Sequence, residues 1–245
     1  MVRKRPARPF ILMDESDPFP DPQRYDKEGL VAIGGSLSPA RLEAAYRSGI
    51  FPWYGEGYMP LWWSPDPRAL LTPDRFHVSR SLRKTIRRGG FNVTWNACFA
   101  RVMRECSERR EDGQWILPEM VDAYSELHRR GNAHSLEVWC EEELVGGVYG
   151  VQFGRLFCAE SMFHRATDMS KVALTAMVRS LFAAGIEVFE VQFVTSHLAS
   201  LGAFEVPRSA YLEMARAASA AALRLVDPLA SCDWQREASD RIDDV

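Results

Sequence analysis

Three consecutive segments in the second half of the sequence alternate apolar and polar residues with a period of two, and this feature restricts the fold more than any other. They read SLEVWC, LVGGVYGVQF and LFCAESMF, over residues 135–140, 144–153 and 156–163. Only EEE and GR join them. This pattern predicts an antiparallel meander of three strands.

Helical patterns and two further strands surround the meander. Ser38 and Ser79 are placed as N-caps of two helices, and Gly49 ends the first of them. The expected helices cover residues 38–49, 79–88, 96–108, 118–130, 168–185 and 208–225, and the further strands cover 91–96 and 187–194. The order of these elements predicts an α+β fold, in which only the acidic tail after Asp233 is expected to lack structure.

Composition excludes several classes of protein. The 245 residues are 47% hydrophobic, which supports a substantial core, and no apolar run approaches the roughly 18 residues that span a bilayer. The five cysteines form no CxxC pair, and the five histidines have no zinc-ligand spacing. We expect a soluble cytoplasmic protein with reduced cysteines and no metal.

Positive charge is concentrated in one part of a chain whose net charge is −3. No acidic residue occurs between Arg75 and Arg104, which include eight cations. Five of these have the spacing that places them on one stripe of the helix over 79–88: Arg80, Arg83, Lys84, Arg87 and Arg88. The stripe suits the phosphate backbone of a nucleic acid, and the alternative is a solvated helix face.

Two carboxylates fall on expected strands among apolar neighbours. Alternation puts Glu160 on one face with Cys158 and Met162, and it puts Glu190 on one face with Gln192. A buried carboxylate costs several kcal/mol unless it is paired or hydrogen-bonded. Either each carboxylate caps loop amides or pairs with a buried arginine, or together they form a polar pocket for an amine or a hydroxyl.

The stretch FPWYGEGYMPLWWSPDPRALL, over residues 51–71, holds six aromatic side chains and is too rich in glycine and proline for a helix. Such a surface suits stacking on a nucleobase or packing between domains. For Trp62 and Trp63 we favour a joint between two domains.

These segments, taken in order, resemble the bacterial leucyl/phenylalanyl-tRNA–protein transferases. The resemblance covers residues 29–212 and rests on GLVAIGGSLSPARLEAAYRSGIFPW, LWWSPDPRALL, HVSRSL, GQWILPEMVDAYSELHRRGNAHSLEVW, ELVGGVYGVQFGRLFCAESMF, SKVAL and HLASLGAFEVPR. It implies transfer of leucine, and less readily phenylalanine or methionine, from aminoacyl-tRNA to the N-terminal Arg or Lys of an acceptor protein. The product carries an N-end-rule degradation signal.

The resemblance also implies a domain organisation. A small N-terminal domain over residues 1–67 precedes an acyl-CoA N-acyltransferase-like domain over 68–232, whose mostly antiparallel sheet is flanked by helices, and a flexible tail covers 233–245. The glycine-containing loop that holds coenzyme A pyrophosphate in acetyltransferases is replaced here by HRATDM. No cofactor is therefore expected.

Several substrate-binding residues follow from the resemblance. It implies that Trp53 and Trp115 stack on or border the 3′ adenosine of the tRNA and its aminoacyl group. Val148, Met162 and Met177 line the pocket for the leucine side chain. Flat aromatic rings and adaptable thioethers suit these tasks.

The resemblance further implies which residues act at the ester. Glu190 and Gln192 match an Asp-x-Gln pair beside the reacting ester, and Glu160 matches a glutamate that holds the aminoacyl α-amino group and ribose. Glu190 accepts the amine proton and Gln192 polarises the carbonyl region. In the alternative mechanism, the ribose 2′-hydroxyl moves the proton and Glu190 only orients.

This sequence departs from the family pattern near the expected centre. Glu190 stands where Asp is usual, Ala159 where Gly is usual, and Thr195-Ser196 where Asn-Asp is usual. Two alternatives therefore stay open beside a changed acceptor preference: an acyltransferase that uses coenzyme A, against which the missing loop counts, and a tRNA-binding protein with little activity.

Overall fold

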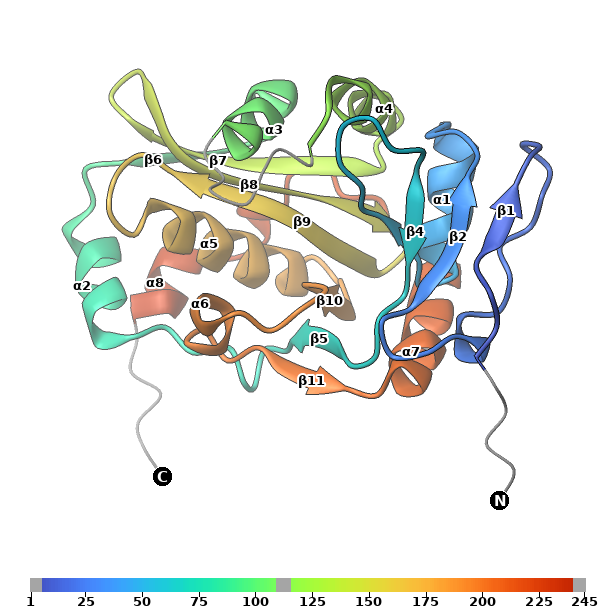
Figure 1. The fold of residues 1–245 in the computed structure, drawn as a ribbon. Coiled ribbons are helices and arrows are strands. Elements are labelled where there is room, and N and C mark those ends of the chain that lie inside the picture. Colours follow the sequence, from blue (N-terminus) through green and yellow to red (C-terminus); the bar gives the residue numbers. More distant parts are fainter. Residues whose placement is uncertain (1–5, 109–115, 240–245) are drawn as a thin grey trace.

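The computed structural model describes residues 6–108 and 116–239 and contains two sheets with helices packed around them (Figure 1). The expected α+β class is confirmed, with a small N-terminal part and a large, mostly antiparallel sheet flanked by helices. No helix within the described residues combines the length and the apolar character that crossing a membrane requires.

The smaller sheet is built from the N-terminal part of the chain. Its strand order is β1-β2-β4-β3, and β1 runs parallel to β2 while the other pairs are antiparallel. The strands are β1 (Phe10–Leu12), β2 (Leu30–Gly34), β3 (Phe51–Pro52) and β4 (Leu61–Trp63). Trp62 is fully buried in this sheet, where its indole N–H donates to the Gly34 carbonyl (2.8 Å). Trp62 therefore packs in the small sheet, within a buried cluster that also contains residues of the larger sheet.

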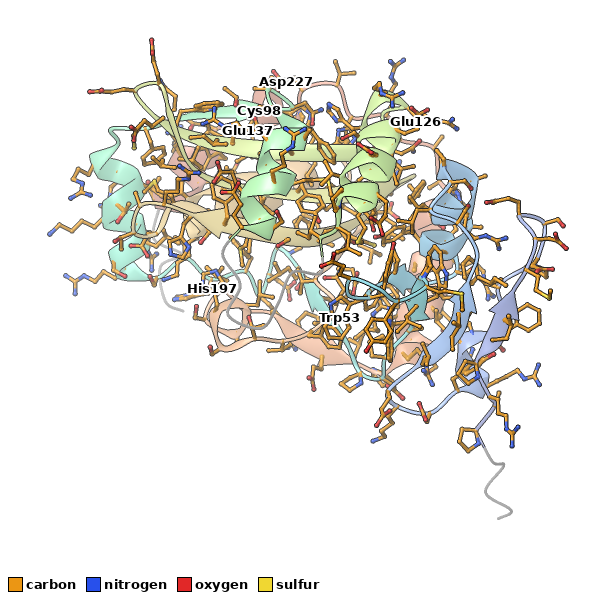
Figure 2. All side chains as sticks on the ribbon, turned by 45° about the horizontal axis from the view of Figure 1, so that its top comes forward. Trp53, Cys98, Glu126, Glu137, His197 and Asp227 are labelled. Carbon is orange, nitrogen blue, oxygen red and sulfur yellow. The ribbon has the colours of Figure 1, made fainter. Side chains whose placement is uncertain are left out.

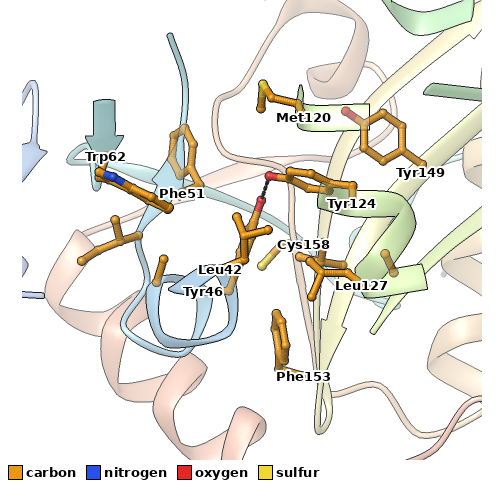
Figure 3. Close-up of a cluster of buried hydrophobic side chains, with 14 of the residues drawn as sticks. Leu42, Tyr46, Phe51, Trp62, Met120, Tyr124, Leu127, Tyr149, Phe153 and Cys158 are labelled. Atoms are coloured by element: carbon orange, nitrogen blue, oxygen red, sulfur yellow. Dashed lines mark hydrogen bonds between the residues drawn. The ribbon is translucent and has the colours of Figure 1, made fainter. Parts of the chain in front are cut away.

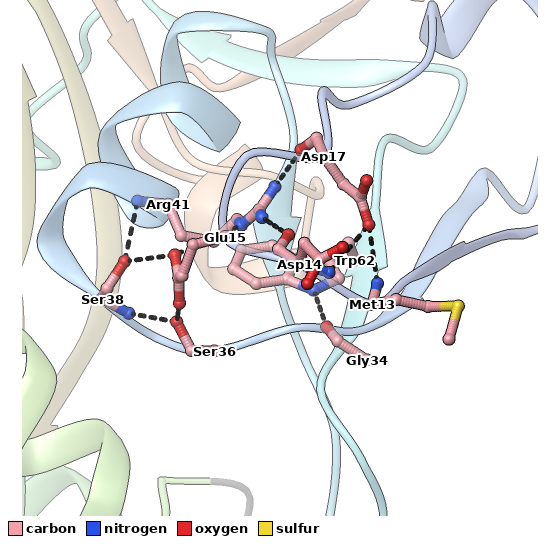
Figure 4. Close-up of polar contacts among 9 residues, drawn as sticks. All are labelled: Met13, Asp14, Glu15, Asp17, Gly34, Ser36, Ser38, Arg41 and Trp62. Atoms are coloured by element: carbon pink, nitrogen blue, oxygen red, sulfur yellow. Dashed lines mark hydrogen bonds and ion pairs between the residues drawn. The ribbon is translucent and has the colours of Figure 1, made fainter.

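Helix α1 (Pro39–Arg47) begins as the sequence predicts. The Ser38 hydroxyl accepts the Arg41 backbone N–H (3.2 Å), which satisfies a donor of the first turn. The Arg41 guanidinium, 3% exposed, donates to the carbonyls of Asp14 and Asp17 (Figure 4). These contacts fix the loop after β1 against the helix.

The larger sheet has the strand order β11-β5-β10-β9-β8-β7-β6. The predicted meander forms its centre, with β7 and β9 each antiparallel to β8, and only the β9–β10 pair is parallel. The strands are β5 (Arg68–Leu71), β6 (Asn92–Trp95), β7 (Ala133–Cys140), β8 (Glu143–Phe153), β9 (Leu156–His164), β10 (Val188–Glu190) and β11 (Phe204–Val206).

Helices cover both faces of the larger sheet. On one face lie α1, α3 (Phe99–Ser107), α4 (Pro118–Arg129) and α7 (Arg208–Ala220). On the other face lies α5 (Met169–Ala183), against which α2 (Arg80–Arg88) and α8 (Trp234–Ser239) pack (Figure 1). Three short helices complete the chain: η1 (Pro22–Arg24), α6 (Ser196–Ala199) and η2 (Pro228–Ser231).

The expectation of a tail without structure after Asp233 is wrong for residues 234–239, which form α8. Trp234 and Ala238 are buried there, 7% and 1% exposed. Their i, i+4 spacing gives a short apolar face in an otherwise polar segment, and this face packs on α2 and α5.

A β-bulge in β9 changes the predicted faces of that strand. Tyr149 of β8 pairs with Ser161 and Gly150 pairs with Ala159, so Glu160 has no partner across the ladder. Glu160 therefore does not share a face with Met162, which packs on the α5 side.

The strand predicted over 187–194 is shorter in the structure. Strand β10 ends at Glu190, and Gln192 has a left-handed φ of 55°. The alternation rule consequently fails after Glu190, and Gln192 does not continue its face.

One buried cluster joins the two sheets. The cluster contains Leu42 and Tyr46 of α1, Tyr124 of α4, and Phe153 and Cys158 of the larger sheet (Figure 3). The Tyr46 and Phe153 rings stack with centroids 5.9 Å apart. The N-terminal part therefore shares its core with the larger sheet.

Candidate functional site

Two cavities lie side by side where the small sheet meets the larger one, and they have volumes of about 340 and 350 Å³. Trp53, Gln192 and Phe193 line both of them. We call these three residues the shared wall. The loop after β3 supplies Trp53 and the loop after β10 supplies the other two, so segments far apart in sequence form the wall together.

The apolar cavity, about 340 Å³, contains few polar groups. A carboxylate, a side-chain amide and two hydroxyls contribute to a surface that is otherwise apolar or aromatic. Its lining residues are Phe51, Pro52, Trp53, Glu160, Ser161, Met162, Val191, Gln192, Phe193, Thr195 and Leu198. Such a chamber fits an apolar side chain that carries a polar group at one end.

The second cavity, which we call the acidic cavity, has three carboxylates and one ammonium group in its lining. Its lining residues are Lys27, Glu28, Trp53, Trp63, Pro65, Asp66, Pro67, Ala69, Gln192, Phe193 and Glu205. Glu28 and Glu205 are exposed, and Asp66 accepts the Arg208 backbone N–H (3.0 Å). The balance of charge favours a cationic ligand.

Trp53 is 46% exposed although neighbouring aromatic rings support it (Figure 2). Its ring centroid lies 6.2 Å from that of Trp63 and 6.4 Å from that of Phe193. The Trp63 indole N–H donates to the Trp53 carbonyl (2.7 Å), which fixes the backbone of the loop. One side of this rigid ring is thus available for stacking.

Glu190 does not line either cavity. It is fully buried, and its Oε1 accepts from Arg68 Nε (3.1 Å), from Arg68 Nη2 (2.8 Å) and from the Gln192 backbone N–H (2.6 Å). Glu190 therefore follows the first interpretation of these carboxylates: it pairs with a buried arginine, and it also caps a loop amide. This ion pair keeps the Arg68 guanidinium charged, because the adjacent carboxylate raises its pKa against the effect of burial.

Glu160 does line the apolar cavity. Its Oε1 accepts from the Tyr46 hydroxyl (2.7 Å) and from Gln192 Nε2 (3.3 Å). The Tyr46 hydroxyl lies 2.6 Å from that of Tyr124 (Figure 3). Burial raises the pKa of Glu160 to about 8, which the hydrogen bond from Tyr46 opposes. The carboxyl group can therefore exchange a proton near neutral pH.

The structure brings together only some of the residues expected to bind the aminoacyl group. Met162 lines the apolar cavity, whereas Val148 of β8 and Met177 of α5 are 2% and 0% exposed in the core against which Met162 packs. Trp115 lies outside the described residues.

The cationic stripe forms as expected on α2, which Ser79 caps by accepting the Leu82 backbone N–H (3.2 Å). Leu82 and Ile86 point into the core, and four of the five cations are exposed while Arg83 is partly buried. None of the five forms an ion pair with another described residue. Their charge is therefore available to a partner.

Nucleophilic catalysis by Cys158 has no support in the geometry. The thiol is fully buried, 3.9 Å from the Tyr211 hydroxyl, and burial raises its pKa well above the ordinary value. A thiolate is the reactive form of cysteine, so this environment opposes its formation.

Sequence reasoning missed Arg68, Tyr46 and Tyr124 as members of the site. Arg68 and Glu190 are 122 positions apart, and Tyr46 and Glu160 are 114 apart, so no local pattern links them. A lone arginine that opens the apolar run RALL was the one available signal.

Comparison with known proteins gives consistent matches along the chain. A model of the leucyl/phenylalanyl-tRNA protein transferase family matches residues 70–216, and a model of its N-terminal domain matches residues 35–66. Relatives that bear the name leucyl/phenylalanyl-tRNA–protein transferase include three from different bacteria. That of Pectobacterium carotovorum is 49% identical over 84% of this chain and 89% of its own. That of Methylococcus capsulatus is 52% identical over 81% and 86%, and that of Anaeromyxobacter sp. is 48% identical over 91% and 94%.

The two family models together match most of the chain, and the relatives cover at least four fifths of it at about half identity. The chain belongs to the leucyl/phenylalanyl-tRNA–protein transferase family.

Proposed function

We propose that this protein transfers leucine, and less readily phenylalanine or methionine, from aminoacyl-tRNA to the N-terminal Arg or Lys of acceptor proteins. The observation that carries the proposal is the pair of cavities with one shared wall. Two substrates bound in these cavities meet at Trp53, Gln192 and Phe193, which is the arrangement that a direct transfer between them requires.

The apolar cavity takes the aminoacyl end of the donor. Met162, Phe51 and Leu198 offer apolar surface to a leucine side chain, and the flexible thioether adapts to Phe or Met. Trp53 stacks on the terminal adenosine, since base stacking on an aromatic ring contributes about 1–3 kcal/mol. Glu160 holds the α-amino group of the donor or a ribose hydroxyl.

The acidic cavity takes the N-terminal residue of the acceptor. Glu28, Asp66 and Glu205 attract a guanidinium or an ammonium group, and they discriminate against an acidic or neutral N-terminus. This charge distribution supports Arg and Lys as acceptors.

The chemistry needs positioning more than activation, because the aminoacyl ester is already reactive. The acceptor amine attacks the ester carbonyl, an oxyanion forms, and the ribose oxygen leaves with a proton. Gln192 borders both cavities and orients the carbonyl region, while Glu190 holds the Gln192 backbone. This assignment favours orientation by Glu190 over acceptance of the amine proton.

The stripe on α2 holds the RNA. Arg80, Lys84, Arg87 and Arg88 present exposed positive charge, which suits the phosphates of the donor tRNA. We assign the reaction to the cytoplasm, where charged tRNA and new proteins are found, and its product to N-end-rule degradation.

The test is transfer of radiolabelled leucine from charged tRNA to matched peptides beginning with Arg, Lys, Asp or Met. Transfer to the Arg and Lys peptides alone supports the proposal. Transfer to Asp means that Ala159, Glu190 and Thr195-Ser196 accompany a changed acceptor preference. Binding of charged tRNA without transfer to any peptide overturns the proposal and leaves a tRNA-binding protein.

A further inference from the structure

The two buried carboxylates of the site differ in access. Glu160 lines the apolar cavity, whereas the Glu190 side chain is 1% exposed and lines neither cavity. A group that takes a proton from a substrate must come within hydrogen-bond distance of it. Of the two residues, only Glu160 is therefore placed where a substrate can reach it, whatever the pKa of each carboxyl group.

Arg68 holds Glu190 in its buried place. The guanidinium donates through Nε and Nη2 to Glu190 Oε1, and its Nη1 donates to the Gly49 carbonyl (2.6 Å). It lies over the rings of Tyr211 (4.2 Å to the centroid) and Phe51 (5.2 Å). The guanidinium thus makes three hydrogen bonds and lies against two aromatic rings. These contacts hold Arg68, and with it the Glu190 carboxylate, away from the cavities.

Gln192 connects this buried pair to the cavities. Its backbone N–H donates to Glu190 Oε1, in a left-handed conformation that the hydrogen bond supports, and its side-chain Nε2 donates to Glu160 Oε1. Because Gln192 lines both cavities, Glu160 lies one hydrogen bond away from the place where the two substrates meet.

From this geometry we infer that Glu160, in addition to its contact with the donor, is the catalytic residue that accepts the proton from the attacking amine. The Arg68–Glu190 pair then acts as a positioning element. It fixes the backbone of Gln192, whose side chain in turn orients the Glu160 carboxyl group.

The step balances as follows. The acceptor enters as an ammonium group and transfers one proton to Glu160 in its ionised form, which is the minor form at pH 7 because the pKa is about 8. The free amine then forms the C–N bond at the ester carbonyl. The C–O bond to the ribose breaks, and the second amine proton goes to the leaving ribose oxygen. Glu160 later returns its proton to solvent, so that one peptide bond, one hydroxyl and one released proton result.

The surroundings of Glu160 suit this task. Tyr46 of α1 and Tyr124 of α4 face it with hydroxyls whose pKa values burial raises well above 10, so they stay neutral, while Glu190 of β10 and Arg68 of β5 act on it with opposite sign. A carboxyl pKa of about 8 matches the α-amine of a peptide, which is about 7.7–8.0. Proton exchange between the two groups is then nearly thermoneutral.

The inference rests on the proposed function, and its test separates the two. Single-turnover transfer from saturating Leu-tRNA is measured at pH 7 for two acceptors that differ in one group: an Arg peptide, and the same peptide with an aminooxy group in place of the α-amine. The aminooxy group is neutral at pH 7 and brings no ammonium proton. If the unaltered enzyme transfers to neither acceptor, the proposed function fails.

We expect Glu160→Gln to slow transfer to the amine peptide by about 100-fold or more and to slow transfer to the aminooxy peptide by less than about 10-fold. Damage to the fold slows both equally. Glu143→Gln, an exposed carboxylate at the start of β8, is the matched control and should change neither rate. An equal loss with both acceptors, a loss below 10-fold with the amine, or an amine-specific loss in Glu190→Gln instead overturns the inference.

Discussion

Arg68 and Glu190 form an ion pair that is almost completely shielded from water, with side chains 2% and 1% exposed. Removing two charges from water costs more than the attraction alone returns unless further hydrogen bonds satisfy them. The Gly49 carbonyl and the Gln192 amide supply one such bond to each partner, while Glu190 Oε2 has no hydrogen-bond partner among the described residues. We therefore expect the pair to add little to the free energy of unfolding. Its main effect is to fix the backbone conformation of Gln192 beside the cavities.

At the same scale, Glu160 gives the protein a pH-dependent stability. The pKa of Glu160 in the folded chain is about 8, above the ordinary carboxyl value of about 4.3. Between these values the folded state keeps a proton that the unfolded state has lost, so the free energy of unfolding falls as pH rises toward 8. Glutamine does not titrate, and Glu160→Gln should therefore be more stable than the parent at pH 8.5, by about 4 kcal/mol, with little difference at pH 5.

Urea unfolding at both pH values measures this effect. The Glu143 carboxylate is exposed, so Glu143→Gln should differ from the parent in free energy of unfolding by the same small amount at pH 5 and at pH 8.5. A Glu160→Gln stability difference that does not change between pH 5 and pH 8.5 would mean that the carboxyl titrates normally in the folded protein.

The exposed carboxylates of the acidic cavity make a smaller, kinetic contribution. Glu28→Gln combined with Glu205→Gln should raise KM for an Arg peptide about fivefold with kcat nearly unchanged, since exposed charge pairs contribute about 0.2–1 kcal/mol each. The effect should shrink at high salt. Steady-state kinetics with Glu213→Gln as control, an exposed carboxylate of α7, would show no change in KM.

At the scale of elements, local signals predicted the helices well. Ser38 and Ser79 act as N-caps because the interaction lies within one turn of chain. The strands near the site were harder, since the bulge at Glu160 and the left-handed Gln192 depend on pairing with β8 and β5 and on Arg68. The alternation rule holds for a regular strand, whereas Glu160 lies at a bulge and Gln192 lies beyond the end of β10. Tyr46 and Arg68 joined the site through contacts more than 100 residues apart, which no spacing rule detects.

The α2 stripe leads to a prediction about salt dependence. Arg80→Glu combined with Lys84→Glu should weaken tRNA binding and reduce the slope of log K against log salt by about 2, because two phosphate contacts are lost. Titrations between 50 and 200 mM salt measure the slope. Arg129→Glu with Arg130→Glu, exposed cations at the C-terminal end of α4, is the control of equal charge change and should keep the parent slope. If the α2 variant has the same slope of log K against log salt as the parent, the tRNA binds to another surface.

Helix α8 should matter for stability despite its place near the end of the chain. Trp234→Ala removes a buried indole that packs on α2 and α5, and we expect a loss of about 3 kcal/mol in the free energy of unfolding. Gln235→Ala, its exposed neighbour, should cost less than about 0.5 kcal/mol. Equal unfolding midpoints for the two variants would show that α8 adds nothing to the core.

At the scale of the whole molecule, the cluster around Leu42, Tyr46 and Tyr124 makes the two sheets depend on each other. The shared wall has the same origin, because Trp53 comes from the N-terminal part and Gln192 and Phe193 come from the larger sheet. The shared wall therefore exists only when both parts are packed together, and residues 1–67 cannot form it alone.

The shared wall also has a consequence for the kinetics of turnover. Each cavity has its own lining away from the wall, so neither substrate needs the other to enter. The buried Cys158 thiol lines neither cavity, and the Ser161 and Thr195 hydroxyls line the apolar cavity alone, so no nucleophile of the described residues lies in the shared wall to carry the acyl group. The rate law that follows is sequential, with a ternary complex and intersecting double-reciprocal lines rather than parallel ones.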